Sequence, residues 1–150
     1  MAYSLSTEDS MKQKGFTLIE MLVVMCLIGM SAAITLPALA YKIQRGKQLQ
    51  TLDQMQILKT GLDEYWAKHC HTLPADLSGL KGDTVLGIPS DGWGRAFGYT
   101  KNSETSYELW SLGSDGVVET HAAAITSTWG SDIVVKDSVF VRYPQGTQHE

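Results

Sequence analysis

An apolar segment near the N-terminus limits the structures that this chain can form. Residues 16–41 read FTLIEMLVVMCLIGMSAAITLPALAY, and Glu20 is the single charged residue among them. About 20 apolar residues are enough to cross the hydrocarbon core of a bilayer as a helix, so this segment can span a membrane. Lys12 and Lys14 precede it, which by the positive-inside rule keeps the N-terminus in the cytoplasm. We therefore expect a single-pass membrane protein whose C-terminal part lies on the other side.

A cleaved secretory signal is the alternative interpretation of the same segment. Such a signal has a shorter apolar core that is followed by a cleavage site of small residues. Here Gly15 precedes the apolar run, which is the opposite order. Residues 31–33 are small enough to imitate a signal-peptidase site, so this alternative stays open.

The residues around Gly15 resemble a known processing signal. Residues 14–24 read KGFTLIEMLVV, which is similar to the type III signal of type IV pilins and pseudopilins. The resemblance implies that a membrane aspartyl peptidase, the prepilin peptidase, cuts between Gly15 and Phe16 and N-methylates Phe16. Residues 1–15 would then be a leader peptide. A start at Met11 would leave a leader of only five residues.

Glu20 carries the second expectation from this segment. A carboxylate inside hydrocarbon is costly and is seldom kept without a partner. One interpretation is a protonated or snorkelling side chain near the cytoplasmic interface. The resemblance favours the other, in which Glu20 pairs with the free amine of Phe16 in a neighbouring subunit and sets the register of a filament. Further along, Pro37 lacks an N–H and predicts a kink or local melting of the helix.

The segment after residue 40 is amphipathic. Its apolar residues recur every three or four positions, the spacing of one helical face: Leu49, Leu52, Met55, Leu58, Leu62 and Tyr65. We expect one helix over residues 16–68, with a membrane and assembly part at 16–40 and an amphipathic part at 41–68. Residues 69–150 would form a head in which a loop or short helical turn begins at residues 73–76. Strands are expected at 95–100, 105–112 and 132–143, so the predicted fold is α+β, with a small antiparallel sheet on the helix.

Charge and motif content exclude several functions. Residues 68–150 contain six Lys and Arg against ten Asp and Glu, and so carry the whole net charge of −4. Nucleic acid is therefore not the expected partner, because phosphate binding needs a local excess of basic residues. The triplet His69-Cys70-His71 does not predict a metal site, since three consecutive side chains seldom converge on one ion. Cys26 and Cys70 are expected to be free thiols, and no motif of a known catalytic site is present.

A second resemblance comes from the head. Residues 91–95 read DGWGR and residues 107–116 read YELWSLGSDG, which is similar to the major pseudopilin of type II secretion systems. The resemblance implies a structural subunit and no enzyme. Its implied partners are copies of itself, other pseudopilins, the prepilin peptidase, and the assembly platform and ATPase of a bacterial inner membrane. A type IV pilus or competence (minor) pilin is one alternative. A single-span anchored domain that binds a ligand or catalyses a reaction is another.

The same resemblance implies calcium in the loop that follows. Asp115 and Asp132 match the carboxylates of the family's site, and Leu112 would donate a backbone carbonyl. Calcium takes six to eight oxygen ligands, yet residues 120–130 read THAAAITSTWG and contain no carboxylate. The expected site would therefore bind calcium with reduced affinity. The alternative is an Asp-Gly turn at Asp115 and an unrelated aspartate before a strand.

Overall fold

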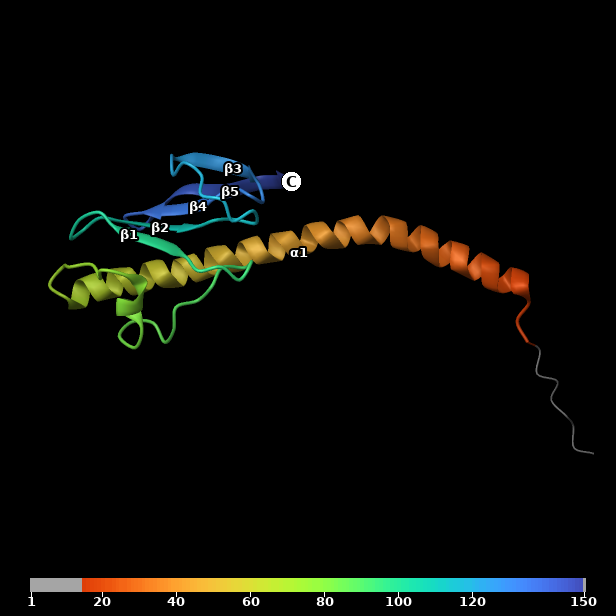
Figure 1. Cartoon of the computed structure of the whole chain (residues 1–150), viewed down its shortest axis with the longest axis horizontal. Coiled ribbons are helices and arrows are strands. Elements are labelled where there is room, and N and C mark those ends of the chain that lie inside the picture. The colour runs from red at the N-terminus through yellow and green to blue at the C-terminus, as the bar shows by residue number, and fades with distance from the viewer. Residues whose placement is uncertain (1–14, 150) are drawn as a thin grey trace, which may run out of the picture. The chain divides into compact units, whose positions relative to one another are not determined.

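The computed structural model describes residues 15–149, which form one helix, one short 3-10 helix and five strands (Figure 1). The elements in chain order are α1 (Leu18–Lys68), η1 (Leu77–Leu80), β1 (Gly98–Lys101), β2 (Tyr107–Ser111), β3 (Ala124–Thr128), β4 (Ile133–Lys136) and β5 (Val139–His149). The predicted α+β class is confirmed. Contacts divide the chain into two units that meet between residues 39 and 40, inside α1.

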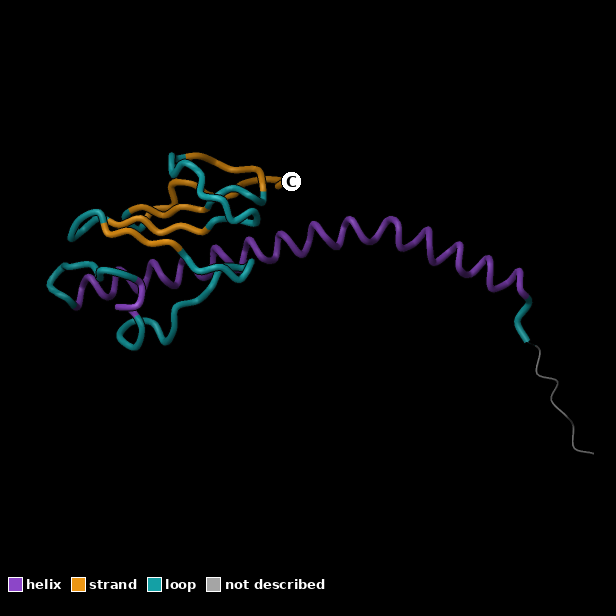
Figure 2. Tube along the Cα trace, in the orientation of Figure 1, coloured by secondary structure: helices purple, strands orange, loops and turns teal. Residues whose placement is uncertain are grey.

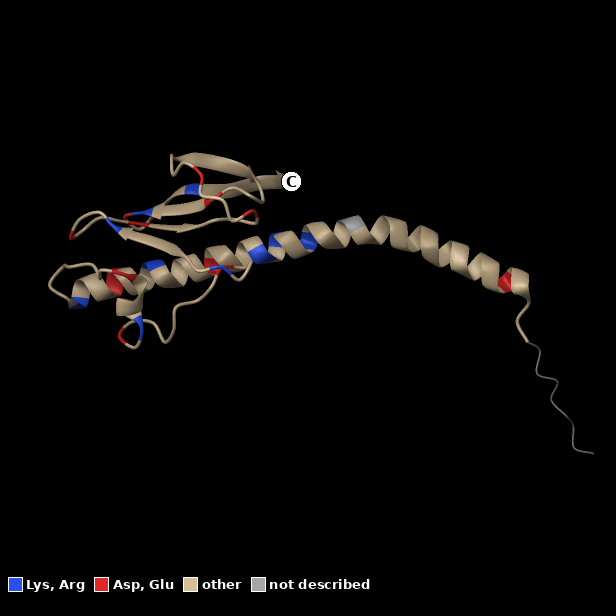
Figure 3. Cartoon of the chain, in the orientation of Figure 1, with Lys and Arg blue, Asp and Glu red and all other residues tan. Residues whose placement is uncertain are grey.

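The first unit is the N-terminal part of α1. Every side chain described in residues 18–39 is exposed, and Glu20 is the single charged residue there (Figure 3). By length and composition this helix can cross a membrane. Its hydroxyl groups bond to the preceding turn, as in the 2.9 Å contact from Ser31 Oγ to the Leu27 carbonyl, which lowers the cost of placing them in lipid. The helix continues through Pro37, so the local melting expected as one outcome does not occur.

The second unit is the head, in which a sheet covers one face of the C-terminal part of α1 (Figure 2). Met55, Leu58 and Leu62 are fully buried against sheet residues that include Leu109 and Val135. Burial of such side chains contributes about 1.5–3 kcal/mol each.

The predicted apolar stripe is correct for Met55, Leu58 and Leu62 and wrong at its start. Leu49 is 46% exposed. Gln48 and Thr51 are buried instead, because each hydrogen-bonds to a segment of the head that lies over this part of α1. Leu52 and Tyr65 are partly buried at the edge of the core.

The first elements of the head agree closely with the prediction from the sequence. Asp76 caps η1, accepting a 2.8 Å hydrogen bond from the Ser78 amide, so the short helical turn expected there is confirmed. β1 and β2 form the predicted antiparallel hairpin, with Gly98 opposite Trp110. β1 begins at Gly98 rather than residue 95 because the Arg95 amide donates to Asp91 Oδ1 and not to a strand.

The second half of the sheet differs from the prediction. The single strand expected at 132–143 is a hairpin of β4 and β5, and its turn residues Asp137 and Ser138 both have positive φ. Positive φ at both central residues is typical of the tight turns that join antiparallel strands. The strand order is β1-β2-β4-β5-β3. β3 was not predicted, and it pairs with β5 in parallel, so the sheet is mixed.

Candidate functional site

The first candidate site is the segment that precedes α1. Gly15, Phe16 and Thr17 have no regular structure, and Phe16 is 73% exposed. The Thr17 hydroxyl accepts from the Glu20 amide at 3.2 Å, and Glu20 Oε2 lies 3.5 Å from the Thr17 amide. This reciprocal pair is a capping box, which satisfies two donors that the first turn of a helix leaves free.

The capping box explains why the helix starts at Leu18 instead of residue 16. Sequence reasoning missed it, although Thr-x-x-Glu before an apolar run is its signature. The structure thus gives Glu20 a partner within its own chain. The expected pairing with a neighbouring Phe16 amine concerns a second subunit and stays a prediction.

In the head, the residues of the DGWGR motif form a tight turn around a buried carboxylate. Asp91 is almost fully buried, and its Oδ1 accepts from the amides of Trp93 and Arg95 at 3.0 and 2.8 Å. Its other oxygen, Oδ2, accepts from the Ser111 hydroxyl of β2 at 2.9 Å. The carboxylate therefore closes the turn and ties it to the sheet.

The same turn is fastened to α1. The Gly92 amide donates to Thr51 Oγ1 at 2.9 Å, and the Trp93 indole Nε1 donates to Gln44 Oε1 at 3.0 Å. A Cβ at Gly92 would lie 2.0 Å from the Lys47 carbonyl oxygen. Only glycine allows the turn to approach the helix this closely.

Arg95 connects this turn to the loop that follows β2. Its guanidinium donates to the carbonyls of Gly113 and Ser114. The motif thus links the helix, the turn and the loop at residues 112–123, which contains two of the three predicted calcium ligands, Leu112 and Asp115.

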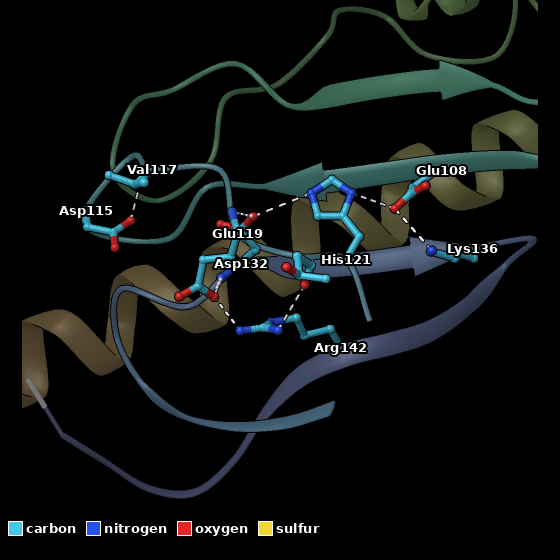
Figure 4. Close-up of polar contacts among 9 residues, drawn as sticks. Glu108, Asp115, Val117, Glu119, His121, Asp132, Lys136 and Arg142 are labelled. Carbon is cyan, nitrogen blue, oxygen red and sulfur yellow. Dashed lines mark hydrogen bonds and ion pairs between the residues drawn. The ribbon is translucent and has the colours of Figure 1, made fainter. Parts of the chain in front are cut away.

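The three predicted calcium ligands are each used by local hydrogen bonds. The Leu112 carbonyl accepts from the Gly116 amide at 3.1 Å. Asp115 is exposed, and its Oδ1 accepts from the Val117 amide at 3.0 Å. Asp132 is fully buried, and its Oδ2 accepts from the Glu119 amide at 2.9 Å. Among the residues drawn in Figure 4, Asp115 contacts only Val117.

A network of charged side chains surrounds Asp132 (Figure 4). His121 Nδ1 lies 2.6 Å from Glu108 Oε1, and its Nε2 lies 3.5 Å from Asp132 Oδ2. Arg142 of β5 donates to the Glu119 carboxylate and, at 3.1 Å, to the Thr120 carbonyl. Lys136 Nζ lies 3.4 Å from Glu108 Oε1 at the outer end.

Burial raises the pKa of the Asp132 carboxyl above its usual value. The hydrogen bond from the Glu119 amide opposes this shift, and so do the charges of His121 and Arg142. The members of the network come from β2, the loop, the β3–β4 connection, β4 and β5, so no local sequence pattern could have identified it.

Within residues 15–149, no group of three or more His, Cys, Asp or Glu side chains is arranged so that it could hold a metal ion. His69 stacks on Tyr65, and His71 packs edge-on against Trp66, so the two histidines of the triplet point to different neighbours. Cys26 and Cys70 are free and exposed.

Comparison with known proteins supports both resemblances. The prokaryotic N-terminal methylation motif matches residues 10–36, and the type II secretion system protein G domain matches residues 81–129. Type II secretion system core protein G of Escherichia coli (strain K12) is 28% identical in an alignment of 127 positions that covers 73% of this chain and 87% of that protein. Core protein G of Vibrio cholerae (serotype O1, El Tor Inaba N16961) is 25% identical over 70% of this chain and 83% of that protein.

These matches include the segment around Glu20 and the turn around Asp91, two of the places where the structure has specific side-chain geometry. The chain is similar along most of its length to core protein G, the major pseudopilin of type II secretion systems, and at its N-terminus to the prokaryotic N-terminal methylation motif.

Proposed function

We propose that this chain is a structural subunit of a type II secretion pseudopilus. The observation that carries the proposal is the combination of an exposed apolar helix, a processing motif before it, and a head that matches core protein G. Apolar side chains that a subunit leaves exposed along a helix need lipid before assembly and other helices after it. A protein that moves from a membrane into a filament meets both needs.

Processing is the first step of this function. Prepilin peptidase cuts between Gly15 and Phe16 and methylates the new amine of Phe16. Residues 15–17, which include the bond to be cut, have no regular structure, which suits a peptide bond that must enter an active site. Glu20 then accepts the Phe16 amine of a neighbouring subunit. Two opposite charges neutralise each other there, which removes the cost of a lone carboxylate in an apolar helix bundle.

The head has no catalytic role in this proposal. Within residues 15–149 its buried carboxylates, Asp91 and Asp132, accept hydrogen bonds from the backbone and so hold loops in place. We place the head in the periplasm and the helix in the inner membrane, with the assembly platform and ATPase supplying the work. Copies of this chain form the filament together with other pseudopilins, and no nucleic acid is bound.

Filament formation tests the proposal directly. The chain is expressed with a type II secretion system, and filaments are collected by shearing and examined by electron microscopy. We expect filaments that contain the chain, and loss of filaments in Glu20→Ala with the protein still in the membrane. The proposal fails if the chain never enters a filament and instead remains a monomeric membrane protein under these conditions.

A further inference from the structure

The loop at residues 112–123 is tied to the sheet by cationic side chains of the protein itself. Arg142 lies in the first half of β5, opposite Val134 of β4 and Ala124 of β3. Its side chain is 15% exposed and reaches across to the Glu119 carboxylate and the Thr120 carbonyl. A guanidinium that donates hydrogen bonds to both a carboxylate and a carbonyl combines electrostatic attraction with a fixed hydrogen-bond geometry.

The carboxylate atoms available to a calcium ion are few. Glu119 Oε2 is held by Arg142 and by the Asp132 amide at 3.4 Å, and Asp132 Oδ2 is held by the Glu119 amide. Asp132 Oδ1 is buried and has no hydrogen-bonding partner among the described residues. Even with the second oxygens of Asp115 and Glu119, which accept no hydrogen bond among the described residues, three such atoms fall short of the six to eight oxygens that calcium takes, so the residues present do not fit an ordinary calcium site.

Two further basic side chains belong to the same region. His121 of the loop lies between Glu108 of β2 and Asp132, and Lys136 of β4 approaches Glu108. Each carboxylate of this network thus faces at least one basic side chain. A divalent cation added there would meet positive charge, which opposes its binding.

β5 makes a second fixed contact at its end. Gln148 is buried, donates to the Thr126 carbonyl of β3 at 3.1 Å, and accepts from Gln48 Nε2 of α1 at 3.3 Å. The strand that carries Arg142 is therefore paired with β4 and β3 on both sides of Arg142 and bonded to the helix near its end. These contacts hold the backbone of Arg142 in a fixed position.

We propose that β5, through Arg142 and its ion pair with Glu119, holds the loop at residues 112–123 in place without calcium. Arg142 and the network around Asp132 do for this chain what a bound cation would otherwise do. The inference concerns the head alone and applies whichever filament the chain builds, so its failure would leave the proposed function untouched.

The test compares calcium with chelator on the full chain in detergent. Thermal unfolding of the head is followed by tryptophan fluorescence, and exchange of the loop amides by mass spectrometry. We expect the same Tm and the same loop protection in millimolar calcium and in EGTA. A ligand well above its Kd raises the Tm of a small domain by roughly 5 °C or more. A calcium-dependent rise of that size, or loop protection that is lost in EGTA, would overturn the proposal.

Substitution of Arg142 provides the second arm. Arg142→Gln is expected to speed exchange of the amides at residues 117–121 on the order of tenfold or more, because charged hydrogen bonds are lost. Lys136→Gln removes the same charge at the more exposed end of the network and is expected to leave those amides nearly unchanged. Equal exchange in wild type and Arg142→Gln would contradict the proposal. If Arg142→Gln does not fold, the calcium comparison on the wild type still decides.

Discussion

Gly92 packs directly on the backbone of Lys47, so that a Cβ at Gly92 would lie 2.0 Å from the Lys47 carbonyl oxygen. This contact sets how closely the Asp-Gly-Trp-Gly turn approaches α1. Because the same turn binds the loop through Arg95, the position of the loop depends on the space that Gly92 leaves.

Gly92→Ala is expected to destabilise the head by about 2 kcal/mol or more, because the added methyl group meets backbone and forces the turn off the helix. Urea unfolding of the full chain in detergent, followed by tryptophan fluorescence, measures this loss. Gly87→Ala is the matched control, since nothing lies within 4 Å of its Cβ position. A Gly92→Ala protein as stable as Gly87→Ala would show that the turn can move away without cost.

Removal of the Asp91 carboxylate leaves two amides and a hydroxyl without an acceptor. Each unsatisfied buried group costs about 1–3 kcal/mol, so Asp91→Ala is expected to lose about 3 kcal/mol or more of the free energy of unfolding. Asp53→Ala, on an exposed part of α1, is expected to change it by less than about 0.5 kcal/mol. The same urea experiment compares the two, and similar losses would contradict the role given to Asp91.

Glu20 has two roles in this account, and they can be separated. Glutamine can replace glutamate in a capping box, so Glu20→Gln is expected to keep the first turn of α1 protected from hydrogen exchange while filament yield falls. Thr17→Val removes the hydroxyl that accepts from the Glu20 amide. It is expected to increase exchange of that amide and to leave filament yield much less affected. The reverse pattern would assign assembly to the cap and not to the charge.

The Tyr99 phenol predicts a pH effect at the alkaline end. Burial raises the pKa of Tyr99 from 10.0 to about 12, and its hydroxyl donates to the Pro74 carbonyl at 3.0 Å. The folded state therefore holds the proton more tightly than the unfolded state, and stability is lost as pH rises from about 10 to about 12. Tyr99→Phe lacks this proton. The difference in the free energy of unfolding between wild type and Tyr99→Phe should shrink over that interval, and a constant difference would contradict the shift.

The long helix and the first hairpin could be predicted because their signals are local. The apolar run and the apolar spacing that follows it identified α1 as far as its end at Lys68, and alternation identified β2. The second hairpin was missed because its turn residues, Asp137 and Ser138, adopt positive φ although neither is a glycine, the residue that usually indicates such a turn. β3 was missed because it is short and mostly exposed, so it carries no clear period-two pattern.

The network in the loop could not be predicted for a different reason. Glu108, Glu119, His121, Asp132 and Arg142 meet only after the sheet has formed, and no spacing in the chain links them. The capping box of Thr17 and Glu20 is the opposite case, since its signature was present in the sequence and went unused.

The measurement that tests the central claim most directly is the intact mass and N-terminal analysis of the chain from its native membrane, beside a Gly15→Ala variant. We expect a mature chain that begins with N-methylated Phe16, and an uncut chain in the variant. A wild-type chain that keeps residues 11–15, or one cut after Ala33, would contradict the assignment of the chain as a processed filament subunit.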